Sequence, residues 1–481
     1  MTTRLGAQAM GRLLGEHWRA TGPGYVALAD RMRALVLDGR LPLDVSVPSE
    51  RRLAEQLHLS RTTVTAAYDS LREAGFLRSR QGSGSWTSVP DRVRPSGGAI
   101  GPPRPDDLDD DVIDLAAATM PADGVAVRAA YEAALLELPR HLPGAGYAAE
   151  GLPEARQAVA DSFTRRGVAT DASQVMVTSG VVSAWSLLLR VLVQPGDRVL
   201  VEQPSYPNAL EAARRAGVRL VPVPLGGVGE PLWDLDTWRA VLRQSAPTLG
   251  YVVPDCQNPT GGVMDDATRA AIVAAADAVG TTLVVDETLV ELRLDGGAPG
   301  RPLASSSPSV VTIGGLSKSA WAGLRLGWVR TSRDLVDRLV EARLSWDMGT
   351  PVVEQLALAH LLTAPDRDAQ AAARRAEVTA RKDALTAALR RELPAWRWRE
   401  PQGGLSLWVE LDRRSSSAMS EQAGSHGLRL AAGPRFGVEG ALERYLRLPF
   451  VVPTDEVDEA VRRLAGLAEA AGTRRPSRLL V

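Results

Sequence analysis

Residues 310–329 read VVTIGGLSKSAWAGLRLGWV, and this stretch decides the fold. Two apolar runs, 310–313 and 326–329, are typical of buried strands, and a glycine-rich loop with one lysine joins them. Only two of the 56 basic residues are lysines, Lys318 in this loop and Lys382 among arginines. A guanidinium cannot form a Schiff base as an amine can, so a lysine in a chain that otherwise uses arginine is a candidate for amine chemistry. Chance survival is the alternative, and it suits Lys382, which is typical of a solvated helix face.

The composition of the 481-residue chain is that of a globular protein, with 45% hydrophobic residues, 23% charged residues and a formal net charge of −1. This balance excludes disorder over most of the length and a uniformly basic coat for nucleic acid. The single cysteine, Cys256, allows no intrachain disulfide and no cysteine-based metal site, so we expect a cytoplasmic location and no metal. No apolar run reaches about 18 residues, which predicts no membrane helix, and residues 1–20 lack the apolar core of a secretory signal.

A segment rich in proline, glycine and aspartate, residues 89–113, divides the chain. Its composition predicts an extended, solvated linker. The unit before it, 20–88, has the pattern of three helices and a hairpin. The unit after it, 114–475, alternates β-branched runs with helical stretches, which is typical of βαβ folds. Its last stretch, 392–471, has strands and a closing helix of its own, which indicates a small C-terminal subdomain. The expected fold class is α/β with a small N-terminal domain.

The smaller unit contains two helical patterns joined by a tight turn at 57–60, which is typical of a helix-turn-helix. The second helix would place its first residues, an arginine and several hydroxyl side chains, at base edges and phosphates. The glycine-rich hairpin tip at 81–84 would be a wing that approaches the minor groove. The residues that these features place at DNA are Arg51, Ser60, Arg61, Thr62, Thr63, Gln81 and Gly82. The alternative is a three-helix packing module with a solvated arginine face.

The blocks PSERRLAEQL (48–57), SRTTVTAAYDSLREAGFL (60–77) and QGSG (81–84) resemble the winged helix-turn-helix of the GntR family of bacterial regulators. The resemblance covers 25–86 and departs in a minor way at Leu-Pro-Leu-Asp (41–44), where the family has a proline–glycine pair. It implies that double-stranded DNA is a partner. By this resemblance the DNA contacts include Arg51, Arg61, Thr62, Thr63 and Gly82.

Several polar residues of the larger unit follow predicted strands. Lys318 can reach a crevice at the carboxyl edge of the sheet, and Arg325, seven residues later, can pair with a phosphate. The turn TSGVVSA (178–184) leads from a strand into a helix whose free N–H groups suit a phosphate, although such turns are common. These features together favour a ligand that carries a phosphate.

Other residues suit the ring and the substrate of such a ligand. Asp286 ends an apolar strand, where a carboxylate can keep a pyridinium nitrogen protonated; a helix N-cap is the alternative. Asn258 in NPTG can donate to a ring oxygen, although this tetrapeptide is also a turn sequence. Tyr206 can stack on a ring, and Arg447 can clamp a carboxylate with two parallel hydrogen bonds.

The order of these blocks resembles fold-type I aminotransferases over residues 114–472: TSGVVSAWSLLLRVLVQPGDRVLVEQPSYPN (178–208), PDCQNPTGG (254–262), VVDET (284–288) and GLSKSAWAGLRLGW (315–328). The resemblance implies that Lys318 forms the internal aldimine of pyridoxal 5'-phosphate, that Asp286 pairs the pyridine nitrogen and that Asn258 binds the phenolic oxygen. Tyr206 would stack on the ring, and Arg447 would receive a carboxylate. The phosphate would be held by Ser179, Gly180, Val181, Ser317 and Arg325.

A winged helix, a linker and an aminotransferase-like domain in one chain resemble the MocR (GabR-like) branch of the GntR family. This branch implies a homodimer, in which each DNA-binding domain reaches the other subunit and Tyr147 approaches the neighbour's phosphate. The family's tyrosine two or three residues after the aspartate is replaced here, at Thr288 and Leu289, and the usual hydroxyl residue before the lysine is Gly315. Both departures favour sensing of an amine or amino-acid effector over turnover. The alternatives are an active aminotransferase with a DNA-binding appendage and a repressor with a cofactor-free dimerisation domain.

Overall fold

The computed structural model describes residues 5–15, 18, 24–37, 41, 45–80, 84–88, 111–438 and 441–473. Two of the expected DNA contacts, Gln81 and Gly82, lie outside the described residues, as does most of the expected linker, 89–110. In the described part, no helix is long and apolar enough to cross a membrane.

The N-terminal domain forms the three helices and the hairpin that the sequence predicts, with a further helix before them. Its elements are α1 (Ala7–Leu14), α2 (Gly24–Leu37), α3 (Glu50–Leu57), α4 (Arg61–Glu73), β1 (Leu77–Arg80) and β2 (Gly84–Thr87). The turn between α3 and α4 closes with His58 in the left-handed region, and the Ser60 side chain caps α4 by accepting from the Thr63 amide. Leu28, Leu53 and Val64 join one buried core, so the apolar faces of the helices pack against one another.

The large subdomain is built on a seven-stranded sheet in the order β4-β10-β9-β8-β7-β5-β6. All strands are parallel except β10, which runs antiparallel to both of its neighbours. The strands are β4 (Val175–Thr178), β5 (Arg198–Gln203), β6 (Arg219–Pro224), β7 (Leu249–Val252), β8 (Thr282–Asp286), β9 (Val311–Gly315) and β10 (Gly327–Arg330). The bounds of β9 and β10 confirm the two strands predicted at 310–313 and 326–329 to within two residues.

Helices cover both faces of this sheet, which explains its nearly continuous apolar strands. Alternate residues of one strand join different cores: Val175 and Val177 belong to one cluster and Met176 to the other. The first face carries α5 (Gly124–Glu137), α6 (Pro153–Arg165), α9 (Leu235–Ser245), α10 (Asp266–Asp277) and α12 (Val352–Thr363). The second face carries α7 (Val181–Leu192), α8 (Pro207–Arg215) and α11 (Arg333–Arg343).

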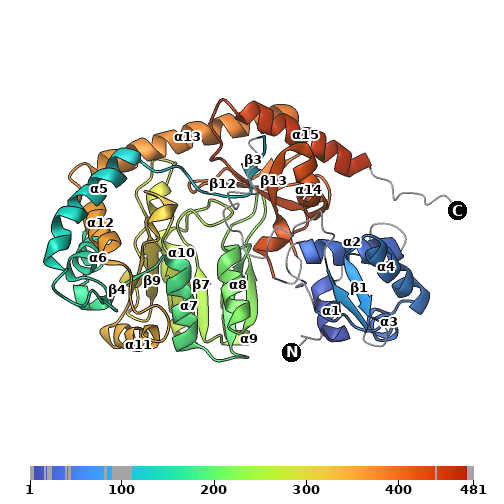
Figure 1. Cartoon of the computed structure of the whole chain (residues 1–481), viewed down its shortest axis with the longest axis horizontal. Coiled ribbons are helices and arrows are strands. Elements are labelled where there is room, and N and C mark those ends of the chain that lie inside the picture. Colours follow the sequence, from blue (N-terminus) through green and yellow to red (C-terminus); the bar gives the residue numbers. More distant parts are fainter. Residues whose placement is uncertain are drawn as a thin grey trace.

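The long helix α13 (Arg367–Glu392) leads from the large subdomain to the small one (Figure 1). The small subdomain has a five-stranded sheet in the order β11-β12-β14-β13-β3. Its elements are β11 (Arg397–Trp398), β12 (Ser406–Glu410), α14 (Ser416–Gln422), β13 (Leu428–Ala432), β14 (Tyr445–Pro449) and α15 (Val457–Thr473). The edge strand β3 (Ile113–Leu115), which the sequence does not predict, starts at the last residue of the expected linker and pairs in parallel with β13.

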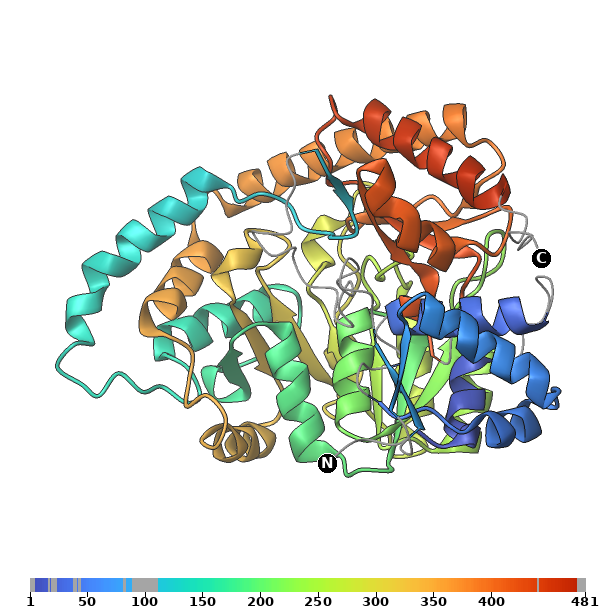
Figure 2. The same ribbon diagram turned by 45° about the vertical axis from the view of Figure 1, so that its right-hand side comes forward.

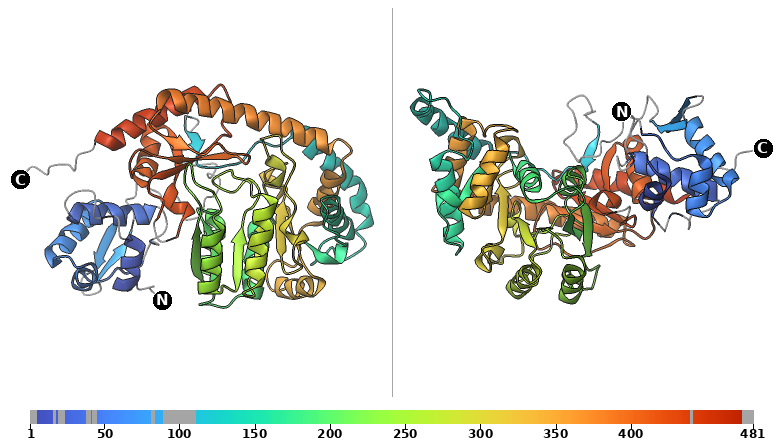
Figure 3. Two further views of the ribbon diagram at one scale, coloured as in Figure 1. Left: turned by 180° about the vertical axis from the view of Figure 1, so that it is seen from behind. Right: turned by 90° about the horizontal axis from the view of Figure 1, so that it is seen from below.

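The N-terminal domain lies beside the small subdomain, at the end of the molecule opposite α5, α6 and α12 (Figure 2). The views from behind and from below agree on this arrangement (Figure 3). The N-terminal domain and the C-terminal strands are therefore neighbours in space, although they stand at opposite ends of the sequence.

Candidate functional site

The candidate site lies at the carboxyl edge of the large sheet, where parallel strands of an α/β fold place ligands. Lys318 follows β9, Asp286 ends β8 and Asn258 follows β7. Gly180 lies between β4 and α7, and Tyr206 lies between β5 and α8. The predicted residues of the large subdomain are thus brought to one edge by the strand order.

Lys318 is the amine at this edge. Its Nζ donates a hydrogen bond of 2.7 Å to the carbonyl oxygen of Ala118, in the segment that follows β3. Burial, together with the nearby cations Arg447 and Arg325, lowers the pKa of Lys318 to about 8, and the carboxylate of Asp286 opposes this shift. A lysine with this pKa has a substantial fraction of neutral, nucleophilic amine near neutral pH.

Asp286 is the buried carboxylate of the site. Its Oδ2 accepts a hydrogen bond of 2.5 Å from the Tyr251 hydroxyl, and its Oδ1 accepts from the amide of Thr288 at 2.9 Å and from the Thr288 hydroxyl. Burial raises the pKa of Asp286, and the hydrogen bonds from Thr288 and Tyr251 counteract that rise. Sequence analysis missed Tyr251, because a tyrosine inside a buried strand looks like any other core residue.

Thr288 and Leu289 are the positions at which the sequence departs from the aminotransferase pattern, and the structure shows what each side chain contacts. The Thr288 hydroxyl is engaged with Asp286, and Leu289 packs against the core of the small subdomain. Neither side chain replaces the tyrosine that the family uses at the ring oxygen. Gly315 is fixed for a different reason: a Cβ there would lie 2.7 Å from the carbonyl oxygen of Leu326, so a serine or threonine does not fit without a backbone shift.

The expected phosphate cradle brings two distant segments together. Arg325 donates to the carbonyl oxygen of Ser179 at 3.3 Å, and a Cβ on Gly180 would lie 3.0 Å from Nη2 of Arg325. Gly180 also has a φ of 92°, which favours glycine. Val181 begins α7, so its amide is one of the free N–H groups of a helix start, and Ser317 is partly buried beside Lys318. These groups fit a phosphate.

Groups expected at the ring and the carboxylate keep unused hydrogen-bonding capacity. Among the described residues, Oδ1 of Asn258 and Nε of Arg447 are buried without a hydrogen-bond partner. Arg447 is 3% exposed, donates to the carbonyl oxygen of Ala116 and lies with its guanidinium carbon 5.0 Å from the centre of the Phe436 ring. Burial lowers its pKa to about 10. Tyr206 accepts from Asn208 at 3.0 Å and is close enough to Asp286, Arg447 and Arg325 to feel their charges.

Glu202 is a second buried carboxylate that sequence analysis missed. It is fully buried and accepts hydrogen bonds from Trp233 Nε1 at 2.9 Å, from the Val253 amide at 3.0 Å and from Gln257 at 3.3 Å. Burial raises its pKa to about 7, against the effect of these three donors. Gln257 also donates to the carbonyl oxygen of Pro204, so the network holds the turns that carry Asn258 and Tyr206.

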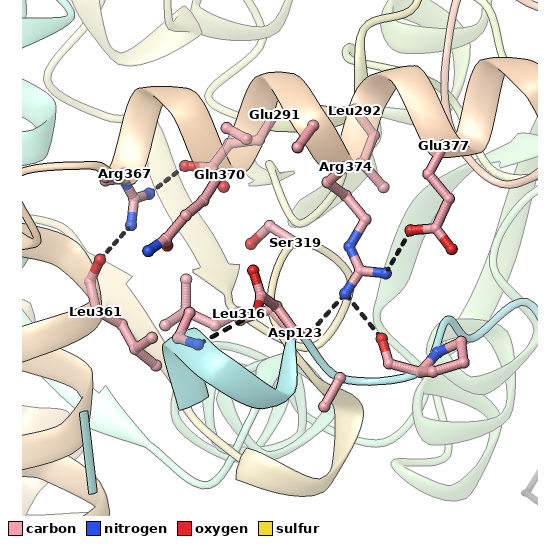
Figure 4. Close-up of a pocket in the computed structure, with 16 residues that line it drawn as sticks. Asp123, Glu291, Leu292, Leu316, Ser319, Leu361, Arg367, Gln370, Arg374 and Glu377 are labelled. Carbon is pink, nitrogen blue, oxygen red and sulfur yellow. Dashed lines mark hydrogen bonds and ion pairs between the residues drawn. The ribbon is translucent and has the colours of Figure 1, made fainter. Parts of the chain in front are cut away.

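A cavity of about 220 Å³ lies behind the lysine loop, between that loop and α13. Ser319, next to Lys318, lines it together with Gln370 and Arg374 of α13 (Figure 4). Arg374 donates to the carbonyl oxygen of Ala320 at 3.2 Å and thereby ties α13 to the loop. The cavity borders the candidate site without including Lys318.

The expected DNA contacts that the structure describes lie at the start of α4 and on α3. Ser60 Oγ lies 2.7 Å from the hydroxyl oxygens of both Thr62 and Thr63. Arg61 is exposed, and the Arg51 side chain is 76% exposed with only a 3.7 Å ion pair to Glu55. The positive groups at this face are therefore accessible to a phosphate backbone. Tyr147 is 72% exposed and stands outside the site of its own chain.

Comparison with known proteins identifies both parts of the chain. Residues 110–464 match the family described as aminotransferase class I and II, and residues 24–86 match the bacterial regulatory proteins of the gntR family. The chain is 31% identical over 344 residues to the probable rhizopine catabolism regulatory protein MocR of Rhizobium meliloti, covering 66% of each chain. It is 26% identical over 468 residues to the HTH-type transcriptional regulator YdcR of Escherichia coli, covering 92% of this chain and 99% of the relative.

A crystal structure of LysN, an alpha-aminoadipate aminotransferase from Thermus thermophilus complexed with N-(5'-phosphopyridoxyl)-L-leucine, superposes with a TM-score of 0.68. It is 28% identical and covers 75% of this chain and 93% of LysN. The fold and the order of domains are thus those of known proteins. The chain belongs to the aminotransferase class I and II family, in the MocR-like architecture in which a GntR-type helix-turn-helix precedes the aminotransferase-like domain.

Proposed function

We propose that the protein is a pyridoxal phosphate-dependent transcription regulator that binds double-stranded DNA through residues 20–88 and senses an amine or amino acid in residues 114–475, with 89–113 as the connecting linker. One observation carries the proposal. The carboxylate of Asp286 and the guanidinium groups of Arg325 and Arg447 all shift the pKa of the Lys318 amine, so charged groups of both subdomains converge on it in a chain that also contains a GntR-type domain.

Each group of the site has a defined task. When bound, pyridoxal phosphate supplies an aldehyde that condenses with amines and a ring that withdraws electrons. Lys318 would offer the amine that holds the aldehyde, and the carboxylate of Asp286 would accept a hydrogen bond from the protonated ring nitrogen. Ser179, Gly180, Val181, Ser317 and Arg325 hold the phosphate, Asn258 binds the ring oxygen and Tyr206 covers the ring. Arg447 receives the carboxylate of the effector.

The local chemistry favours sensing over turnover. Thr288 and Leu289 stand where aminotransferases have a tyrosine for the ring oxygen, and the Thr288 hydroxyl donates to Asp286 instead. Without this donor, the exchange of one amine for another is slower, while binding of the first amine is retained. Once the carboxylate of an effector has engaged Arg447, slow exchange would keep the effector bound long enough to bias the affinity for DNA, which is an allosteric coupling between two sites.

We also propose a cytoplasmic homodimer. Large apolar side chains are exposed around α5 and the loop after it, including Val125, Leu135, Leu136, Leu142 and Tyr147. An exposed apolar patch of this kind marks an interaction surface. A second copy seated on this patch would cover it and bring Tyr147 toward the phosphate cradle of the partner.

The test is a visible absorption spectrum of the protein with pyridoxal phosphate, for wild type and for Lys318→Ala. A cofactor band that only the wild type shows supports the proposal, and aminooxyacetate should then change both the band and the affinity for an operator selected from random duplexes. Absence of a band in both proteins would favour the cofactor-free dimerisation domain. Accumulation of keto acid over many turnovers would favour the active aminotransferase.

A further inference from the structure

Arg72, in the last turn of α4, is the side chain on which the parts of the N-terminal domain converge. Its Nε donates to Ser79 Oγ on β1 at 2.9 Å, and its Nη2 donates to Ser85 Oγ on β2 at 3.3 Å. The same Nη2 lies 3.1 Å from Oε1 of Glu50 on α3, while Nη1 pairs with Asp69 of α4 itself. A guanidinium is planar and its donors have fixed directions, so one side chain joins α3, α4 and the hairpin in a defined geometry.

The carboxylate of Glu50 holds α4 at a second point. Its Oε2 accepts a hydrogen bond of 3.0 Å from the hydroxyl of Thr65, two turns before Arg72 on the same side of the helix. The Arg72 and Glu50 side chains are 29% and 24% exposed, so water screens their ion pair less than that of Asp69, which is 56% exposed. The contact is central to the domain, because α4 packs against both α3 and β1 (Figure 1).

The hairpin needs such an anchor. Strands β1 and β2 have four residues each, Ser79 stands opposite Ser85, and their hydroxyl oxygens lie 3.0 Å apart. A two-stranded ribbon is marginally stable by itself. Backbone hydrogen bonds join β2 to Val45 and Val47 along one edge, about which the ribbon would still be free to tilt. The bonds from Arg72 reach the ribbon from α4 and fix that tilt.

We propose that Arg72 is a positioning residue of the N-terminal domain: together with Glu50 it fixes the angle between α4 and the β1–β2 hairpin, so that both can engage one duplex without rearrangement. Neither side chain has to contact DNA for this role. A hairpin that is free to tilt would have to be ordered during binding, and the entropy lost would weaken the complex. The effect on DNA rests on the proposed function, whereas the fixed angle does not.

The sign of a charge change tests the role of the bridge. Glu50→Gln and Asp69→Asn each remove one negative charge from a partner of Arg72, and next to a phosphate backbone this loss alone tightens binding. Asp69→Asn should bind the selected operator as well as the wild type or slightly better. Glu50→Gln should bind roughly three- to tenfold more weakly, because its amide has one accepting atom instead of two. Binding by Glu50→Gln at or above the wild-type affinity would overturn the proposal.

Arg72→Gln separates positioning from phosphate contact. It should weaken operator binding roughly 10- to 100-fold, as expected for loss of charge-assisted bonds, and leave the slope of log affinity against log salt as in the wild type. The double variant Glu50→Gln/Arg72→Gln should bind within about twofold of Arg72→Gln, because both changes break one network. A slope reduced by about one, or losses that multiply in the double variant, would contradict the positioning role.

A distance measured without DNA separates this inference from the proposed function. Cys256 is 1% exposed, so spin labels can be placed on Glu55→Cys of α3 and Arg78→Cys of β1, both exposed, in full-length protein diluted with unlabelled chains. Pulsed electron paramagnetic resonance should give a narrow distance distribution that broadens with Arg72→Gln and Glu50→Gln but not with Asp69→Asn. Equal widths in all four proteins would refute the positioning role. If the wild type binds no duplex while Arg72→Gln still broadens the distribution, the proposed function fails and the fixed angle stands.

Discussion

The Tyr251 hydroxyl donates a hydrogen bond of 2.5 Å to Oδ2 of Asp286, and both residues are buried. Tyr251 comes from β7 and Asp286 from the end of β8, so neighbouring strands supply the carboxylate and one of the donors that oppose the rise of its pKa. This bond stabilises the ionised form that a pyridinium nitrogen requires.

Tyr251→Phe should weaken binding of pyridoxal phosphate. A hydrogen bond to a charged group contributes about 1.5–3 kcal/mol, which corresponds to roughly 10- to 100-fold in the dissociation constant. Titration of the cofactor absorption band measures the change. Tyr131→Phe, on α5, is the matched control and should leave the constant unaltered. Equal affinities in wild type and Tyr251→Phe would show that this bond does not tune Asp286.

The rate at which Lys318 captures the cofactor should depend on pH in a characteristic way. Only the neutral amine attacks an aldehyde, and the pKa of Lys318 is lowered to about 8. The rate should therefore rise with pH and level off above about 8, whereas an ordinary lysine would keep gaining reactivity up to about 10.4. Stopped-flow absorption measures the profile, and Lys382→Arg should reproduce it. A rate that still rises tenfold per pH unit at pH 9 contradicts this expectation.

Arg447 should discriminate between probes by their carboxylate. Aminooxyacetate and methoxyamine share a reactive aminooxy group, but only the first carries a carboxylate for a bidentate contact. Arg447→Gln should weaken the response to aminooxyacetate by about 10- to 100-fold, as expected for loss of a charge-assisted pair worth about 1.5–3 kcal/mol. The response to methoxyamine should stay within about twofold. Parallel losses for both probes would place the carboxylate elsewhere.

Arg61 should read DNA directly. Arg61→Ala is expected to cost about 1–3 kcal/mol of operator binding if the side chain contacts a base edge. Fluorescence anisotropy with the selected operator measures this cost. Arg128→Ala, an exposed arginine on α5 paired with Glu132, removes the same charge far from the reader and should have little effect. Equal affinities for wild type and Arg61→Ala would remove this residue from the interface.

The sequence predicts the site well where chemistry and strand ends coincide. Lys318, Asp286 and Asn258 each follow an apolar run, and the carboxyl ends of parallel strands meet at one edge of a sheet. Tyr251 and Glu202 escape this reasoning because they lie inside strands, where only the three-dimensional packing reveals which group a side chain meets. The roles of these residues at the cofactor remain predictions.

The contacts between distant segments could not be predicted either. Strand β3 has three residues beside an acidic stretch, and its partner β13 follows some three hundred residues later. No local periodicity encodes such a pairing. The ion pair between Arg33 of α2 and Glu421 of α14 could not be predicted for the same reason, because a charge on a helix face is expected to be solvated until the surface that it contacts is known.

The pairing of β3 with β13 makes the large subdomain an insertion within the small one. The chain leaves the small subdomain after Leu115, completes the entire seven-stranded sheet and returns along α13. The chain that arrives from the N-terminal domain is consequently anchored on the same body that carries Arg447. On the proposed function, a rotation of the small subdomain would therefore carry the entry point of that chain together with Arg447.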